Sequence, residues 1–198
     1  MKKLEEAKKQ LEEERLNKVN VTDTDARLMQ DSKKVIQPGY NGQIGVDAKE
    51  QVIVSADVTQ DATDHYQLEP MVEQAEQNLG ESLEQISADA GYSSYDNLEY
   101  VEEKEIDGYI PDNKLREKLR SEEGKKIYQM RSYTVEPVFG NIKWNKRRLI
   151  MSMRGKRKVK GDFLLMCLAH NIGKIISKIQ TVAEQERVCY QPMMVVAG

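Results

Sequence analysis

The sequence predicts a mixed α/β domain, because strand-like and helix-like segments alternate through its middle. Two segments of strand character, 40–46 and 52–58, precede a helical pattern, a short strand, a second short helix and a last short strand. At 198 residues the chain has the length of one domain with room for an additional arm. No stretch is apolar for long enough to suggest a membrane span.

The elements before and within the first half follow from local patterns. Residues 1–18 are dominated by helix formers and charges, which predicts a charged N-terminal helical arm. Residues 19–39 are rich in turn formers, so we expect a loop. The two strand-like segments are separated by a polar connection, which predicts a hairpin. A helix is expected from an N-cap at Thr63 or Asp64 to about residue 79.

The second half continues the alternation and ends in helices. Short strands are expected at 83–88 and 108–110, with a short helix at 95–104 between them. Apolar residues at helical spacing predict a helix over 135–149 and a C-terminal amphipathic helix over 163–179. We therefore expect one domain over 40–180, followed by a frayed tail, 181–198.

The cysteines and the first residues indicate the compartment. Cys167 and Cys189 form no closely spaced pair, which is typical of a reducing environment. No apolar segment follows the first lysines, so no secretory signal is expected there. We expect a cytoplasmic, nucleoid-associated protein without a membrane partner.

The small net charge of −3 conceals a strong polarity along the chain. Residues 40–113 carry 2 basic and 18 acidic residues, whereas residues 114–160 carry 16 basic and 4 acidic residues. The basic block also contains Trp144, Tyr128 and Tyr133. Such a block is either a solvated face or a binding surface for phosphates.

Asp89 is the first candidate for chemistry. It follows a predicted strand and starts the sequence Asp-Ala-Gly-Tyr. Sites in open α/β sheets lie beyond the carboxyl ends of strands, which favours a functional role. The alternative is an aspartate that caps the next turn.

Glu136 is the second candidate, because it lies among apolar residues at the start of a predicted helix. A carboxylate next to an apolar face is costly unless it is paired or binds a metal. Lys143 follows two turns later on about the same face. The alternative is a first-turn acid that the helix dipole favours, with Pro137 at the first helical position.

A third group of candidates is a run of cations suited to a phosphate backbone. Its members are Lys143, Lys146, Arg147, Arg148, Arg154, Lys156, Arg157, Lys158 and Lys160. The alternative is charge that serves solubility alone.

Taken in order, these motifs resemble the C-terminal catalytic part of bacterial insertion-sequence DDE transposases. The resemblance rests on Asp-Ala-Gly-Tyr at a strand end, then Tyr-x-x-Arg, then Val-Glu-Pro-Val-Phe-Gly-Asn-Ile-Lys. Segments 20–29 and 39–43 and the helix that contains Asn171 are also similar to that family. The resemblance covers roughly residues 19–178.

The resemblance implies a ribonuclease H-like fold with a mixed sheet and a metal-dependent reaction on DNA. Three carboxylates of the family hold two divalent cations, Mg²⁺ or Mn²⁺, and Asp89 and Glu136 match the second and third of them. Tyr128, Arg131 and Lys143 match the family's signature and would contact DNA near the scissile phosphate. The partners implied are double-stranded transposon ends and, in the active state, further copies of the chain.

The sequence also departs from the family pattern. Four residues separate Arg131 from Glu136, where the commonest form of the signature has three. No strand is expected before residue 40 that could carry the first aspartate. The sequence therefore predicts an N-terminally truncated copy that lacks its first strand and leaves open whether the copy is active or inactive. Asp47 or Asp57 is the fallback for the first acid, and Asp23, Asp25 and Asp31 fall in the expected loop.

Three other functions stay open at this point. The chain could be a non-catalytic DNA-binding remnant of a transposase. It could be an oligomer paired through the helical arm, 2–18. It could also be a nuclease of the same fold with another substrate.

Overall fold

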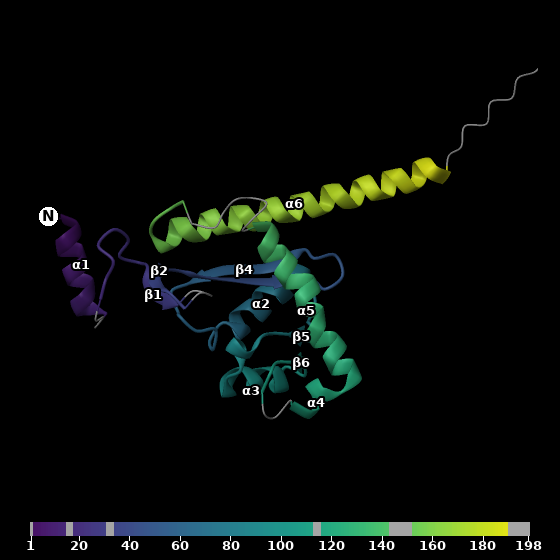
Figure 1. Ribbon diagram of the computed structural model, residues 1–198, viewed down its shortest axis with the longest axis horizontal. Coiled ribbons are helices and arrows are strands. Elements are labelled where there is room, and N and C mark those ends of the chain that lie inside the picture. The colour runs from purple at the N-terminus through teal and green to yellow at the C-terminus, as the bar shows by residue number, and fades with distance from the viewer. Residues whose placement is uncertain (1, 15–17, 31–33, 113–115, 143–151, 190–198) are drawn as a thin grey trace, which may run out of the picture.

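The protein is described by a computed structural model that covers residues 2–14, 18–30, 34–112, 116–142 and 152–189. Helices surround three two-stranded sheets in the described chain (Figure 1). The predicted α/β class is confirmed, whereas a single ribonuclease H-like mixed sheet stays a prediction. Within the described ranges, no helix has the length and hydropathy needed to cross a membrane.

The N-terminal part contains a helix and a small hairpin. Helix α1, Lys2–Glu13, occupies most of the predicted arm. Strands β1, Arg27–Gln30, and β2, Ile36–Gly39, pair antiparallel, so the expectation of a loop over 19–39 is wrong for these residues. The strands are only four residues long and largely exposed, and for that reason the apolar alternation that marks a strand in a sequence is weak here.

The central hairpin is the predicted one. Strands β3, Asn41–Val46, and β4, Ile53–Thr59, pair antiparallel, with an irregularity between Gly45 and Val46. Side chains on both faces of β4 are buried, because α2 and α6 both contact this strand. The hairpin is therefore the middle layer of the domain.

Helix α2, Leu68–Leu79, begins later than the sequence predicts. Its N-cap is Gln67, whose side chain makes no capping bond, while Asp64 is used elsewhere. The helix ends at Gly80 in the left-handed conformation, φ 74°, where glycine carries no side-chain penalty.

The third sheet, formed by β5 and β6, is parallel and lies next to α3. Strand β5, Gln85–Ser87, leads through the short 3₁₀ helix η1, Ala90–Tyr92, into α3, Tyr95–Glu103. Strand β6, Asp107–Tyr109, then pairs with β5. These elements and α2 enclose one buried cluster, formed by Leu68, Val72, Ala88, Val101, Ile106 and Ile110.

Helix α5 differs from its prediction. Helix α4, Arg116–Arg120, is followed by α5, Glu122–Gly140, whose N-cap Ser121 accepts a hydrogen bond from the Gly124 N–H. Glu136 therefore lies in the fifth turn of a helix and not in its first, and Pro137 is inside the helix. Pro137 has no N–H to donate to the Tyr133 carbonyl four residues earlier. Gln51 Nε2 donates to that carbonyl instead, at 2.5 Å, and so replaces the missing helical hydrogen bond.

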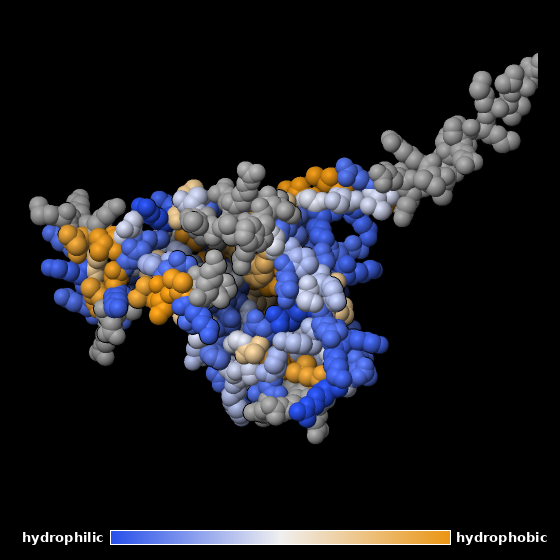
Figure 2. Space-filling view, in the orientation of Figure 1, coloured by the Kyte–Doolittle hydropathy of each residue, from blue (hydrophilic) through white to orange (hydrophobic). Residues whose placement is uncertain are grey.

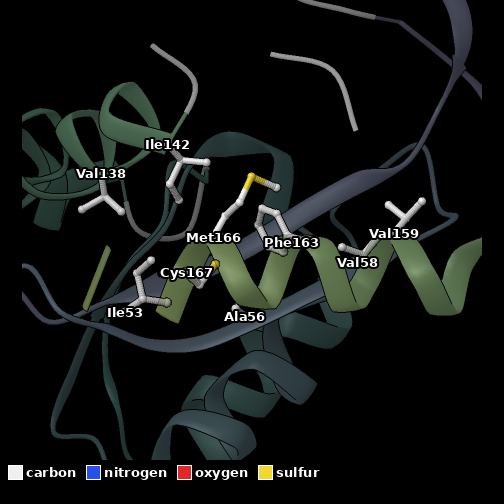
Figure 3. Packing of buried hydrophobic residues seen from close by; sticks show 9 residues of the cluster. All are labelled: Ile53, Ala56, Val58, Val138, Ile142, Val159, Phe163, Met166 and Cys167. Carbon is white, nitrogen blue, oxygen red and sulfur yellow. The ribbon is translucent and has the colours of Figure 1, made fainter. Parts of the chain in front are cut away.

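Helix α6, Lys156–Cys189, is longer than the predicted 163–179 segment and lies across the hairpin. Figure 3 shows its inner face, where Phe163, Met166 and Cys167 pack among residues of β4 and α5. Burial raises the pKa of the Cys167 thiol to about 11, which fits a packing residue. The full cluster consists of Ile53, Ala56, Val58, Val138, Ile142, Val159, Phe163, Met166 and Cys167.

Candidate functional site

Asp89 is the second residue after β5, at the turn into η1. Its Oδ1 accepts a hydrogen bond from the Gly91 N–H at 2.8 Å, so it caps the turn as one alternative expected. Its Oδ2 lies 3.5 Å from Arg131 Nη2 on α5. Asp89 therefore has a local capping role and also faces a residue of the downstream motif.

Helix α5 carries Tyr128 and Arg131 one turn apart. Arg131 Nη1 donates to the Tyr128 hydroxyl oxygen at 3.1 Å, and the guanidinium carbon is 5.4 Å from the centre of the Tyr128 ring. This contact and the Asp89 ion pair fix the guanidinium between two predicted site residues. Glu136 is exposed further along the same helix.

A cavity of about 620 Å³ brings these motifs together. Residues of β3, β5, α2 and α5 line it, and Asp89, Arg131 and Glu136 are among them. Asp89 and Glu136 come from different elements and are far apart in the sequence. The structure places both residues on one cavity, which the two separate motifs do not predict.

Asp64 is a further acid at this cavity, although its sequence context predicts only a helix cap. Its Oδ1 accepts hydrogen bonds at 2.7 Å from Asn41 Nδ2 and at 2.7 Å from Gln43 Nε2, both on β3. A methyl group placed on Gly91 would lie 2.8 Å from Asp64 Oδ2 and 2.9 Å from Asp89 Oδ1. The two carboxylates therefore flank one glycine, where any side chain would crowd them.

Tyr92 links the two sides of the cavity. Its hydroxyl donates to Gln43 Oε1 on β3, and Gln43 is only 2 % exposed. Burial raises the pKa of Tyr92, and the carboxylates of Asp64 and Asp89 raise it further, against a smaller opposing effect of Arg131. The phenol is therefore a permanent hydrogen-bond donor at neutral pH.

The carboxylate oxygens of Asp64, Asp89 and Glu136 at this cavity are of the type that hard divalent cations prefer as ligands. Within the described ranges, no group of three or more His, Cys, Asp or Glu side chains is arranged to hold a metal ion. Asp89 and Glu136 line the same cavity, and their role as metal ligands stays a prediction.

The two fallback acids have structural partners of their own, although Asp47 also lines the cavity. Asp47 Oδ2 caps the hairpin turn by accepting from the backbone N–H groups of Lys49 at 3.1 Å and Glu50 at 2.6 Å. Asp57 Oδ1 pairs with Lys160 Nζ on α6 at 2.8 Å. Among the loop acids, Asp31 lies outside the described residues.

Asp23 and Asp25 hold the start of α6. Asp23 Oδ1 accepts from the Gly155 N–H at 3.1 Å, and Asp25 Oδ2 accepts from the Lys156 N–H at 2.8 Å. Burial raises the pKa of Tyr40, whose hydroxyl donates to Asp23 Oδ1 at 2.9 Å. These acids are structural, and they satisfy backbone donors that a helix start leaves unpaired.

The predicted cationic run is only partly described. Lys143, Lys146, Arg147 and Arg148 lie outside the described residues. Arg154 lines a second cavity of about 790 Å³, away from Asp89. Lys156, Arg157 and Lys158 are exposed at the start of α6, whereas Lys160 is half-buried and paired with Asp57.

The sequence did carry one signal for Asp64. Asn41 and Gln43 are alternate residues of a predicted strand, so their amides lie on the same face. Buried amides need partners, and a nearby acid is the natural one. That pattern points to a polar contact but does not say which acid provides it.

A mixed α/β domain with an acid-lined cavity beyond a strand end is compatible with several metal-dependent nucleases and transferases. Residues 103–176 match the family model described as "Transposase DDE domain". The matched range contains Tyr128, Arg131, Glu136 and the cationic run, and it begins after Asp89. The predicted resemblance to DDE transposases is thereby confirmed. Comparisons with curated proteins and with solved structures gave no match.

Proposed function

We propose that the chain carries part of the catalytic site of a transposase, which cleaves and joins DNA at the ends of an insertion sequence. The observation that carries this proposal is that Asp89 and Glu136 line one cavity together with Arg131. The family match supports the reaction class, since DDE transposases act on phosphodiester bonds.

In this proposal Asp89 and Glu136 hold Mg²⁺ or Mn²⁺. When bound, the cations stabilise the attacking and leaving oxygens of an in-line displacement. Arg131 neutralises Asp89 in the free protein and would turn to a DNA phosphate when a cation takes the carboxylate. Tyr128 holds the guanidinium through its hydroxyl, so it positions Arg131.

The remaining acid, which corresponds to the first of the family's three, would come from one further strand between β3 and β5. In the described chain, β3 pairs only with β4 and β5 pairs only with β6. The cavity lies between these two strands, and its α2 side is apolar, with Leu68, Met71 and Val72. An extended segment there would pair with open strand edges and bury its side chains. Asp64 precedes a helix and is not on a strand.

DNA would bind through the cationic run. The exposed side chains of Lys156, Arg157 and Lys158 and the undescribed Lys143, Lys146, Arg147 and Arg148 would contact phosphates. Such contacts give salt-dependent affinity with little sequence preference.

The second candidate is a DNA-binding remnant without catalysis. It is favoured by the incomplete ligand set, since the described residues offer no three-acid group. Both candidates predict DNA binding, and they differ in cleavage alone.

The test is a cleavage and binding assay with a labelled transposon end and Mg²⁺ or Mn²⁺. The catalytic candidate predicts nicking by the unchanged chain, none by Asp89→Asn, and equal DNA binding by both. Asp96→Asn is the matched control, because Asp96 is an exposed acid in the first turn of α3. It should nick like the unchanged chain.

The outcomes separate the candidates. Salt-dependent binding without nicking in any variant supports the remnant. Nicking that survives Asp89→Asn contradicts the assignment of Asp89. Binding that does not change with salt contradicts both candidates.

A further inference from the structure

Helix α6 has two apolar faces, and only one of them packs on its own domain. The inner face carries Val159, Phe163 and Met166. The opposite face holds six apolar side chains that are each 44–65 % exposed. We call this set the α6 seam: Leu165, Leu168, Ile172, Ile175, Ile179 and Val182. Figure 2 shows hydrophobic surface on the outer side of this helix.

The seam has the spacing of a coiled-coil interface. Its members alternate steps of three and four residues along α6, which is the a and d pattern of a heptad repeat. Over 165–182 the seam is about 26 Å long at 1.5 Å per residue. A contiguous exposed apolar stripe of this kind marks an interaction surface.

We propose that the α6 seam pairs with the same seam of a second copy of this chain, with the two helices antiparallel. This inference does not depend on the proposed catalytic function. An isologous pair needs a surface that is complementary to itself. A stripe with the same class of side chain at every a and d position meets that requirement.

The charges next to the seam allow self-pairing. The charged side chains of Asp, Glu, Lys and Arg within 161–182 are Asp162, Lys174 and Lys178. Each is bound within its own copy: Asp162 to Ser152, Lys174 to Gln51 and Lys178 to Glu50. Two copies can therefore meet across the seam without opposing two free like charges.

The cations at the start of α6 decide the direction. In a parallel pair, the exposed Lys156, Arg157 and Lys158 of both copies would lie together and repel. In an antiparallel pair centred between Ile172 and Ile175, the two cationic segments would lie roughly 50 Å apart along the helices. Figure 1 shows the second half of α6 extending past the sheets, far from α1, so α1 does not cover the seam.

The oligomeric state of the full chain tests the pairing. A seam of this length is at the low end of interface sizes, so we expect a dimer that dissociates on dilution below the micromolar range. Sedimentation at tens of micromolar should give the dimer for the unchanged chain and the monomer for Ile172→Glu/Ile175→Glu. Gln180→Glu adds a charge to an exposed position of α6 outside the seam and should stay dimeric. Circular dichroism should be the same for all three.

Cysteine cross-linking tests the direction. In a Cys189→Ser background, Leu168→Cys/Ile179→Cys should form inter-chain disulfides, because these positions oppose each other only in the antiparallel pair. Leu168→Cys alone should cross-link poorly. Efficient cross-linking of the single variant overturns the antiparallel direction. A monomer at all concentrations, or a dimer that survives the double glutamate variant, overturns the seam as the interface.

Discussion

At the scale of single residues, the turn between β3 and β4 is a junction of three elements. Gln51 has a left-handed backbone, φ 57°, and its side chain donates to the Tyr133 carbonyl of α5. The same side chain accepts from Lys174 Nζ of α6 at 2.7 Å, and the backbone carbonyl oxygen of Gln51 lies 2.9 Å from His170 Nε2. One residue of a turn thus replaces the bond that Pro137 cannot make and ties α5 to α6.

We expect Gln51→Ala to lower the free energy of unfolding by about 1 kcal/mol, because it removes hydrogen bonds to two helices. Urea denaturation followed by circular dichroism measures the change. Lys49→Ala, in the same turn, should have little effect. In a Pro137→Ala background the helix regains its own donor, and the cost of Gln51→Ala should fall; an unchanged cost would contradict the compensating role of Gln51.

The cavity residues illustrate why a site is harder to predict than a motif. Asp89, Arg131 and Glu136 were found from their order in the sequence, and the structure places them on one cavity. Asp64 was missed, because its local context also fits an N-cap and its true partners lie more than 20 residues away on β3. Local chemistry indicates that a side chain needs a partner, while only the fold supplies the partner.

At the scale of elements, the N-terminus of α6 is capped by residues from the start of the chain. Asp25 accepts from the Lys156 N–H, and Asp23 accepts from the Gly155 N–H. Carboxylates at a helix N-terminus satisfy free donors and interact favourably with the helix dipole. The segment that contains Asp23 and Asp25 therefore fixes where α6, the longest described helix, begins.

We expect Asp25→Ala to destabilise the protein by about 1 kcal/mol, the usual cost of losing a cap. The melting temperature and the urea midpoint should both fall. Asp25→Asn keeps an acceptor at this position and should recover most of the loss. Equal effects of the two substitutions would contradict the capping role.

Elements are predicted well where apolar periodicity and turn residues agree, and less well where an apolar stripe does not show which side packs. The hairpin, α2, α3 and the β5–β6 pair follow their apolar periodicity closely. The apolar stripe of 163–179 predicted a helix but not which side packs, and most of its leucines and isoleucines point outward. Helix α5 was placed too late, because Pro137 is a typical helix-start residue whose tertiary compensation the sequence does not reveal.

At the scale of the whole molecule, stability depends on ion pairs that join elements. Glu76 of α2 accepts from Lys104 Nζ, after α3, at 2.9 Å and from the Leu83 N–H at 3.1 Å. The hydrogen bond from Lys104, then that from Leu83, lowers the pKa of Glu76 below its ordinary value of 4.5. These contacts hold α2 against the layer that contains β5 and α3.

This shift gives the fold a predictable dependence on pH. A carboxyl with a lowered folded-state pKa stabilises the fold above its unfolded pKa, and this contribution is lost as pH falls from 4.5 through the lower, folded-state pKa. We expect Glu76→Gln to lower the free energy of unfolding at pH 7. We also expect the free energies of unfolding at pH 7 and at acid pH to differ less in this variant than in the unchanged chain. Urea titrations at several pH values measure both. The same pH dependence in the variant as in the unchanged chain would contradict this role.

The long-range hydrogen bonds of α6 have a consequence for folding during synthesis. The Ile53 backbone of β4 exchanges two hydrogen bonds with the side chain of Asn171, 118 residues later. Asp23 and Asp25 accept hydrogen bonds from the start of α6, which lies more than 130 residues after them. During synthesis, one apolar face of β4 therefore leaves the ribosome long before its cover exists. Folding dominated by such distant contacts is slow. We expect this face of the hairpin to stay exposed until the last quarter of the chain, which contains α6, emerges and covers it.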